Sequence, residues 1–124
     1  MIPDDPEQLG PLLVSLARQS NIDAILLTGG TGISPRDQTY ECILGQLDRV
    51  IPGFGELFRM LSYDEIGSAS LLSRAIGGLI GTTVVLSMPG SRGAVQLAMT
   101  KIVLPELGHL VREAGKGLTS GGSQ

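Results

Sequence analysis

The feature that most constrains the fold of this chain is a glycine-rich loop between a short apolar run and a helical pattern. The apolar run is AILL (residues 24–27), the loop is TGGTGISP (residues 28–35), and the helical pattern covers residues 39–47. A short apolar run bounded by glycines predicts a buried parallel strand. This order of elements is typical of an open α/β sheet, in which ligands bind at the carboxyl ends of the strands.

The remainder of the chain continues the alternation of helices and strands. The pattern predicts a helix beginning at Asp4-Asp5 and ending at Asn21, a turn over residues 51–55 and a short helix over 56–61. It further predicts strands over 76–80 and 82–87 that pair around Gly81, and one or two helices over 95–113. We therefore expect one α/β domain over residues 1–114, with a mostly parallel sheet, and a flexible Gly/Ser-rich tail over 115–124.

Composition excludes several classes of function. The chain has 124 residues, a net charge of −3 and only two lysines among its nine basic residues, which argues against a basic patch for nucleic acid. Cys42 is the only cysteine and His109 the only histidine, so a disulfide framework or a zinc cluster within one chain is not expected. We interpret both residues as structural. No apolar run approaches the length of a membrane span and no signal peptide is present, so a cytoplasmic location is expected.

The first candidate site is the glycine loop itself. Glycines allow backbone N–H groups to approach an anion or a flat ring, and the start of the following helix adds partial positive charge. Asp37 has two alternative roles: it caps the helix, or it holds Mg²⁺ and positions a reacting phosphoryl group. The candidate binding residues in and after this loop are Thr28, Gly29, Gly30, Thr31, Gly32 and Arg36.

A second glycine turn follows the last predicted strand, at Pro89-Gly90-Ser91. Ser91 is either part of an anion-binding site or an ordinary helix N-cap. Asp4 is either a helix cap or a second functional carboxylate beside Asp37. Two carboxylates with no nearby His or Cys suit metal-assisted phosphoryl or nucleotidyl transfer, which needs positioning and charge neutralisation rather than a covalent nucleophile. The loop spacing matches neither the nucleotide P-loop nor the dinucleotide fingerprint.

Taken together, these strings resemble the MogA/MoaB family of molybdopterin-binding proteins of molybdenum cofactor biosynthesis. The resemblance rests on TGGTGxxxRDxT (residues 28–39), PGFGE (52–56), LSYDEIGSASLLSRAIGG (61–78) and the MPGSRGAVQLAM string from residue 88. It implies a three-layer α/β sandwich that forms a trimer or hexamer. It also implies transfer of AMP from ATP to molybdopterin with Mg²⁺ and release of pyrophosphate; the alternative is a MoaB-like protein that binds molybdopterin without turnover.

The same resemblance implies roles for individual residues. Asp37 and Asp4 would be the functional acids and would hold Mg²⁺ through the nucleotide, while both glycine turns would bind the pterin or its phosphate. Ser73 and Arg74 match a Ser-Arg step and are candidate substrate-binding residues, whereas Glu65 is expected to be structural or at a subunit contact. Other molybdenum cofactor biosynthesis proteins are possible partners. Family members carry a longer segment before the Pro-Asp step, so we expect the domain to be incomplete at its N-terminus, with a misassigned start as the favoured explanation.

Overall fold

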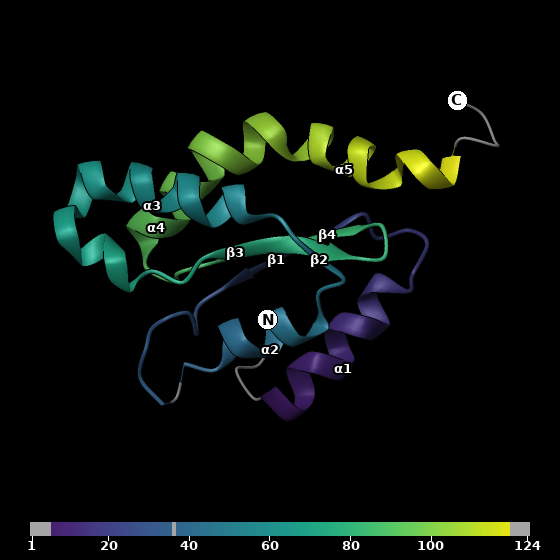
Figure 1. Ribbon diagram of the computed structural model, residues 1–124, viewed down its shortest axis with the longest axis horizontal. Coiled ribbons are helices and arrows are strands. Elements are labelled where there is room, and N and C mark those ends of the chain that lie inside the picture. The colour runs from purple at the N-terminus through teal and green to yellow at the C-terminus, as the bar shows by residue number, and fades with distance from the viewer. Residues whose placement is uncertain (1–5, 36, 120–124) are drawn as a thin grey trace.

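The computed structural model describes residues 6–35 and 37–119, and shows one sheet between two layers of helices (Figure 1). Two helices cover one face, α1 (Pro6–Ala17) and α2 (Thr39–Gln46). Three helices cover the other face, α3 (Pro52–Ile66), α4 (Arg92–Ala98) and α5 (Leu104–Thr119). The short helical segments η1 (Gly67–Leu72) and η2 (Met99–Val103) follow α3 and α4. The expected three-layer α/β sandwich is confirmed.

The sheet contains β1 (Ala24–Thr28), β2 (Arg49–Val50), β3 (Ile76–Ile80) and β4 (Thr83–Met88) in the order β1-β4-β3-β2. β1 is parallel to β4, but β4 pairs antiparallel with β3, and β3 pairs antiparallel with β2. The expectation of a mostly parallel sheet is therefore wrong for the described strands. Only Gly81 and Thr82 separate β3 from β4, and so short a connection can join antiparallel strands only.

The first strand is parallel as expected, but it is not buried on both faces. Ile25 and Leu27 are buried against the layer of α1 and α2, whereas Leu26 on the opposite face is 37% exposed. β1 is the terminal strand of the described sheet, so the layer of α3, α4 and α5, which lies over the central strands, leaves it partly open.

The boundaries of several helices differ from the sequence prediction: α1 ends at Ala17 rather than Asn21, and larger differences occur at α3 and α5. Residues 51–55 were expected to form a turn, yet α3 begins at Pro52, because proline is well suited to the first position of a helix. Phe54 and Phe58 then lie one turn apart on the buried face. At the other end of the chain, α5 extends to Thr119, past Gly115, where we expected the tail to begin. Its apolar residues pack on the core as far as Ala114.

Two apolar clusters, one on each face of the sheet, hold the layers together. Ile43 of α2 packs against Val85 and Ile76 on one face, and Phe58 of α3 packs against Val84 and Leu86 on the other. Because β4 contributes to both clusters and is fully buried, it is the central support of the fold. Among the described residues, no helix combines the length and the apolar character that crossing a bilayer demands.

Candidate ligand-binding site at the strand ends

The two glycine turns lie side by side because they follow β1 and β4, which are parallel neighbours. The backbone N–H of Gly29 donates a hydrogen bond of 2.9 Å to the carbonyl of Met88. A Cβ added to Gly90 would lie 3.1 Å from the Cα of Gly29, so a larger residue would push the two turns apart. The predicted convergence of these turns is therefore a direct consequence of strand pairing.

The first loop requires glycine at two consecutive positions. Gly29 has φ of +96° and Gly30 has φ of +69°, values that residues with a Cβ rarely adopt. A Cβ on Gly30 would also lie only 2.0 Å from Oγ1 of Thr39, at the start of α2. Thr39 in turn donates its backbone N–H to the carbonyl of Gly30 at 3.2 Å, which ties the loop to the helix.

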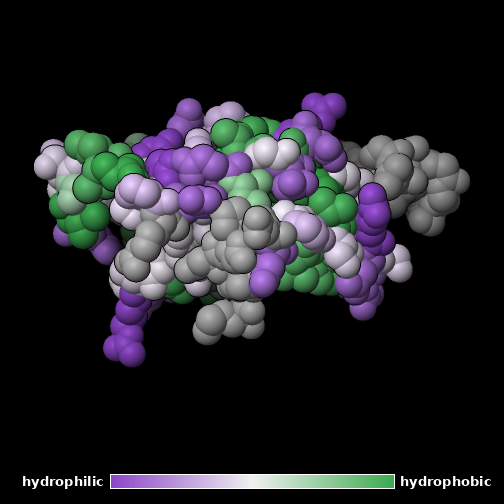
Figure 2. All heavy atoms as spheres, turned by 90° about the horizontal axis from the view of Figure 1, so that it is seen from below, coloured by the Kyte–Doolittle hydropathy of each residue, from purple (hydrophilic) through white to green (hydrophobic). Residues whose placement is uncertain are grey.

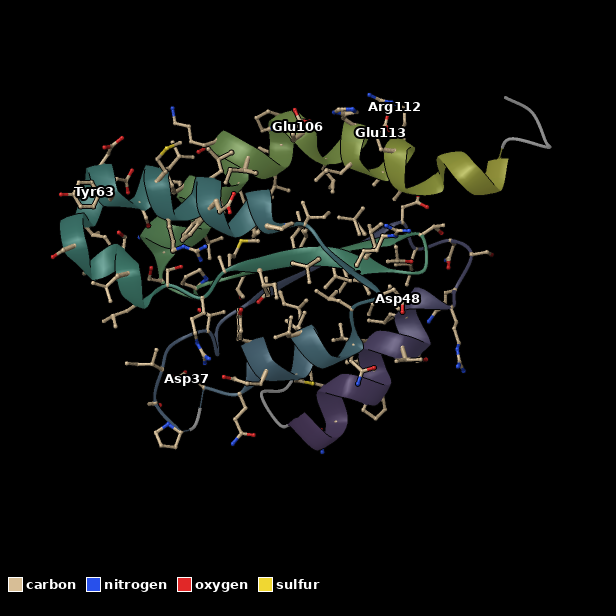
Figure 3. All side chains as sticks on the ribbon, in the orientation of Figure 1. Asp37, Asp48, Tyr63, Glu106, Arg112 and Glu113 are labelled. Atoms are coloured by element: carbon tan, nitrogen blue, oxygen red, sulfur yellow. The ribbon has the colours of Figure 1, made fainter. Side chains whose placement is uncertain are left out.

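Asp37 lies near the end of this loop (Figure 3) and does not cap α2. Its Oδ2 accepts a hydrogen bond of 3.1 Å from the backbone N–H of Ser34, whereas the cap position of the helix is Gln38, which makes no side-chain cap bond. A Cβ on Gly32 would lie 2.7 Å from the same Oδ2. The carboxylate is thus held above a glycine, and the half-buried Asp37 is one of the residues that line a cavity.

A cavity of about 330 Å³ opens between the two turns and the end of α3. Its volume falls in the range of small-molecule sites in proteins. Eight of the predicted site residues and six others line it: Gly30, Thr31, Gly32, Asp37, Ser73, Pro89, Gly90 and Ser91, together with Phe58, Ser62, Ile66, Ala69, Leu72 and Ala94. The structure therefore brings most of the candidate residues to one place.

Two serines in the cavity wall differ in what their hydroxyls do. Ser91 is the N-cap of α4, and its Oγ accepts a hydrogen bond of 3.2 Å from the backbone N–H of Ala94. The Oγ of Ser73 is buried and has no hydrogen-bond partner among the described residues. A buried hydroxyl without a partner is unfavourable, and the residue that carries this one lines the cavity.

Arg74, a predicted substrate-binding residue, does not line the cavity, because its guanidinium is occupied behind the glycine loop. Nε donates to the carbonyl of Thr31 at 3.2 Å, and Nη2 donates to the carbonyls of Gly32 and of Asp37, the latter at 2.9 Å. Glu41 accepts from Nη1 and Nη2. The hydrogen bond from Arg74 is the main reason that the pKa of the Glu41 carboxyl is lowered.

Of the four remaining predicted residues, two lie beside the cavity without lining it and two are outside the described part of the chain. Thr28 and Gly29 precede it, at the end of β1 and the start of the loop, and are absent from its lining. Asp4 and Arg36 lie outside the described residues.

Sequence reasoning missed the wall contributed by α3. Phe58, Ser62 and Ile66 recur every four residues and so lie on one helical face that points into the cavity. This four-residue spacing is visible in the sequence. The sequence prediction ends the helix at residue 61, however, so it does not place Ser62 and Ile66 on the same helix as Phe58. Glu65 of the same helix is exposed.

Acidic groups elsewhere do not form a second centre. Within residues 6–35 and 37–119, no three His, Cys, Asp or Glu side chains gather closely enough to hold a metal ion. His109, on α5, accepts or donates a hydrogen bond of 2.7 Å with Glu106, and its side chain is about half exposed. Glu106 and Glu113 lie on the far side of the sheet from Asp37 (Figure 3).

Fold and site together define a three-layer α/β domain with a ligand cavity at the carboxyl ends of two parallel strands. The chain belongs to the MoaB/MogA family of molybdenum cofactor biosynthesis proteins: residues 1–109 match the family described as "Probable molybdopterin binding domain". Among its relatives, molybdenum cofactor biosynthesis protein B of Halalkalibacterium halodurans is 54% identical over 114 residues, which is 91% of this chain and 67% of that protein. The Bacillus subtilis protein of the same name is 50% identical, over 94% of this chain and 69% of that protein.

Solved structures agree with this assignment. A crystal structure of a molybdenum cofactor biosynthesis protein B aligns with a TM-score of 0.88 at 52% identity, covering 93% of this chain and 72% of the other. The tungsten cofactor synthesizing protein MoaB from Pyrococcus furiosus aligns with a TM-score of 0.80 at 40% identity, covering 90% and 71% of the two chains. The chain therefore has the fold of these proteins as well as their sequence pattern.

Proposed function

We propose that this protein binds molybdopterin in the cavity between the two glycine turns and acts in molybdenum cofactor biosynthesis. The observation that carries the proposal is the meeting of both turns, Asp37 and the unpartnered hydroxyl of Ser73 around one cavity. The family description names molybdopterin as the bound molecule, and the cavity has the two kinds of surface that such a molecule needs.

One side of the cavity is polar and the other is apolar. The polar side consists of the glycine turns and the two serines, which suit a phosphate group because their N–H and O–H groups donate hydrogen bonds. The apolar side is built by Phe58 and Ile66 of α3 and by Leu72 of η1. A flat pterin ring would rest on that side, with its phosphate toward the turns.

We further propose that the protein transfers AMP to the bound molybdopterin. An oxygen of the terminal phosphate of molybdopterin attacks the α-phosphorus of ATP, a new phosphoanhydride bond forms, and the bond to the leaving pyrophosphate breaks. Asp37 offers a carboxylate in the cavity lining and Asp4 is the second candidate; oxygen ligands of this kind would hold Mg²⁺. The ion would neutralise the negative charge of the phosphates.

A second candidate function is binding of molybdopterin without transfer. Among the described residues that line the cavity, Asp37 is the only one with a carboxylate. One carboxylate among the described lining residues is a weaker basis for nucleotidyl transfer than a pair. The relatives that share half of the sequence carry the name of protein B rather than of a transferase.

One experiment on wild-type protein and the Asp37→Asn variant distinguishes AMP transfer from binding without transfer. Asn keeps the size of the side chain and the acceptor for the N–H of Ser34, so the fold should be retained. If the protein transfers AMP, wild-type protein with molybdopterin, ATP and Mg²⁺ releases pyrophosphate, and the variant does so at least about 100-fold more slowly. Continuous detection of pyrophosphate measures both rates.

Glu56→Gln is the control, because Glu56 is exposed near the start of α3 and does not line the cavity. Molybdopterin binding measured by calorimetry with no pyrophosphate release from wild-type protein supports the second candidate. Absence of binding as well as release contradicts the whole proposal.

Assembly into a homo-oligomer, a trimer or hexamer, is also proposed. It is supported by an apolar surface at the end of the molecule formed by η1 and the last turn of α3 (Figure 2), where Ile66 is 57%, Leu71 is 72% and Leu72 is 47% exposed. Light scattering of the purified protein measures the assembly, and a monomeric mass at working concentration contradicts it.

A further inference from the structure

The loop between β1 and α2 has few hydrogen bonds of its own. Its ends are tied at Gly29 and Gly30, and a tight turn joins Ser34 to Asp37. The stretch that passes the cavity, Thr31 and Gly32, makes its hydrogen bonds to the guanidinium of Arg74, which lies 42 and 43 residues further along the chain.

The guanidinium itself is held in one orientation from three directions. Its Cζ lies 4.8 Å from the centre of the Tyr40 ring, and Glu41 pairs with it from the first turn of α2. The carbonyls of Thr31, Gly32 and Asp37 complete the set, so the side chain is only 23% exposed. A planar group with donors in a fixed fork can bridge several acceptors in this way, whereas the ammonium of lysine is a single point charge.

We propose that Arg74 is a positioning residue that fixes the segment from Thr31 to Asp37 and thereby holds the Asp37 carboxylate at the cavity, without contacting the ligand. This assignment replaces the direct substrate-binding role that the sequence resemblance implied for Arg74. Its consequence for turnover rests on the proposed function, but its consequence for the order of the loop does not.

The order of the loop is tested without any ligand. Trypsin cleaves after arginine, and the bond between Arg36 and Asp37 lies within the loop. In Arg74→Lys, cleavage at this bond under native conditions should be faster than in wild-type protein by at least about tenfold, because local opening exposes it. Cleavage after Arg59, which lies inside α3 next to the buried Phe58, is the internal reference for unfolding of the whole domain.

Arg59→Lys is the matched control. Arg59 is also half-buried and donates a hydrogen bond of 3.5 Å to the carbonyl of Ser73, but none to the described residues of the loop. Its substitution should leave cleavage between Arg36 and Asp37 unchanged. An equal rise at both cleavage sites in Arg74→Lys, or no rise at either, would overturn the proposal.

The link to Asp37 is tested by combining Arg74→Lys with Asp37→Asn and measuring pyrophosphate release. A residue that acts through Asp37 slows release about tenfold when Asp37 is present and less than about twofold in the Asp37→Asn background. Equal slowing in both backgrounds would show that Arg74 acts directly on the substrates and would overturn the proposal. If wild-type protein releases no pyrophosphate, adenylyl transfer fails, while the cleavage experiment still decides whether Arg74 orders the loop.

Discussion

At the scale of single residues, the glycine loop depends on two neighbouring glycines for different reasons. Gly29 needs its positive φ, but a Cβ there would meet nothing within 4 Å. Gly30 needs a positive φ and also lacks space for a Cβ, because Thr39 stands against it. A side chain at Gly29 would therefore cause backbone strain alone, whereas one at Gly30 would cause backbone strain and a steric clash.

Substituting alanine at each position should distinguish these contributions. Gly29→Ala should lower the free energy of unfolding by about 1 kcal/mol through strain alone. Gly30→Ala should lower it by about 2–4 kcal/mol, because overpacking against Thr39 adds to the strain. Urea unfolding followed by circular dichroism measures both values, and equal losses would show that the contact with Thr39 is unimportant.

Glu41 gives the stability of the loop a dependence on pH. Its carboxyl has a pKa below the ordinary value of 4.5, chiefly because Arg74 donates a hydrogen bond to it, so the folded state favours the ionised form. The stabilisation is fully present above pH 4.5 and is lost as the pH falls through the lowered pKa. Exposure of the carboxylate keeps this contribution small.

A comparison of wild-type protein with Glu41→Gln at two pH values tests whether stability falls with pH in this direction. The urea midpoint of wild-type protein should exceed that of the variant at pH 7, and the difference should shrink as the pH is lowered below 4.5. A difference that stays constant over this range would mean that the ion pair with Arg74 does not contribute.

At the scale of elements, a single face of α3 both packs on the sheet and lines the cavity. Phe58 is 1% exposed, belongs to the core with Val84 and Leu86, and also forms part of the cavity wall. Leu57, its neighbour in the chain, points away and is 37% exposed. These two adjacent residues of one helix should therefore contribute very differently to the free energy of unfolding.

Alanine substitutions at these two positions should reflect that contrast. Phe58→Ala should lower the free energy of unfolding by about 3–5 kcal/mol, since it removes a buried aromatic ring and leaves a cavity. Leu57→Ala should lower it by less than about 1 kcal/mol. Denaturant unfolding of both variants provides the measurement, and similar losses would show that α3 does not pack as described.

At the scale of the whole molecule, the features that local sequence determines were predictable. The strand at residues 24–27, the hairpin around Gly81 and the two glycine turns all follow from short apolar runs bounded by glycine. Their convergence was also predictable, since turns that follow neighbouring parallel strands meet at one edge of the sheet.

Features that depend on distant contacts or on context were not predictable. The string Pro52-Gly53-Phe54-Gly55 has the composition of a turn, and it starts a helix because Pro52 suits the first helical position and Phe54 is buried in the core. The role of Arg74 depends on carbonyls more than 30 residues earlier in the chain, which no local pattern indicates.

The central claim is that molybdopterin occupies the cavity between the two turns, and filling that cavity tests it most directly. Ala69 is exposed on η1 and lines the cavity, so Ala69→Trp should fill it without disturbing the core. Ser68, also exposed but absent from the lining, provides the control variant Ser68→Trp. Calorimetric titration with molybdopterin should show binding to wild-type protein and Ser68→Trp, and an affinity at least about tenfold weaker for Ala69→Trp. Equal affinity of the two tryptophan variants would contradict the account.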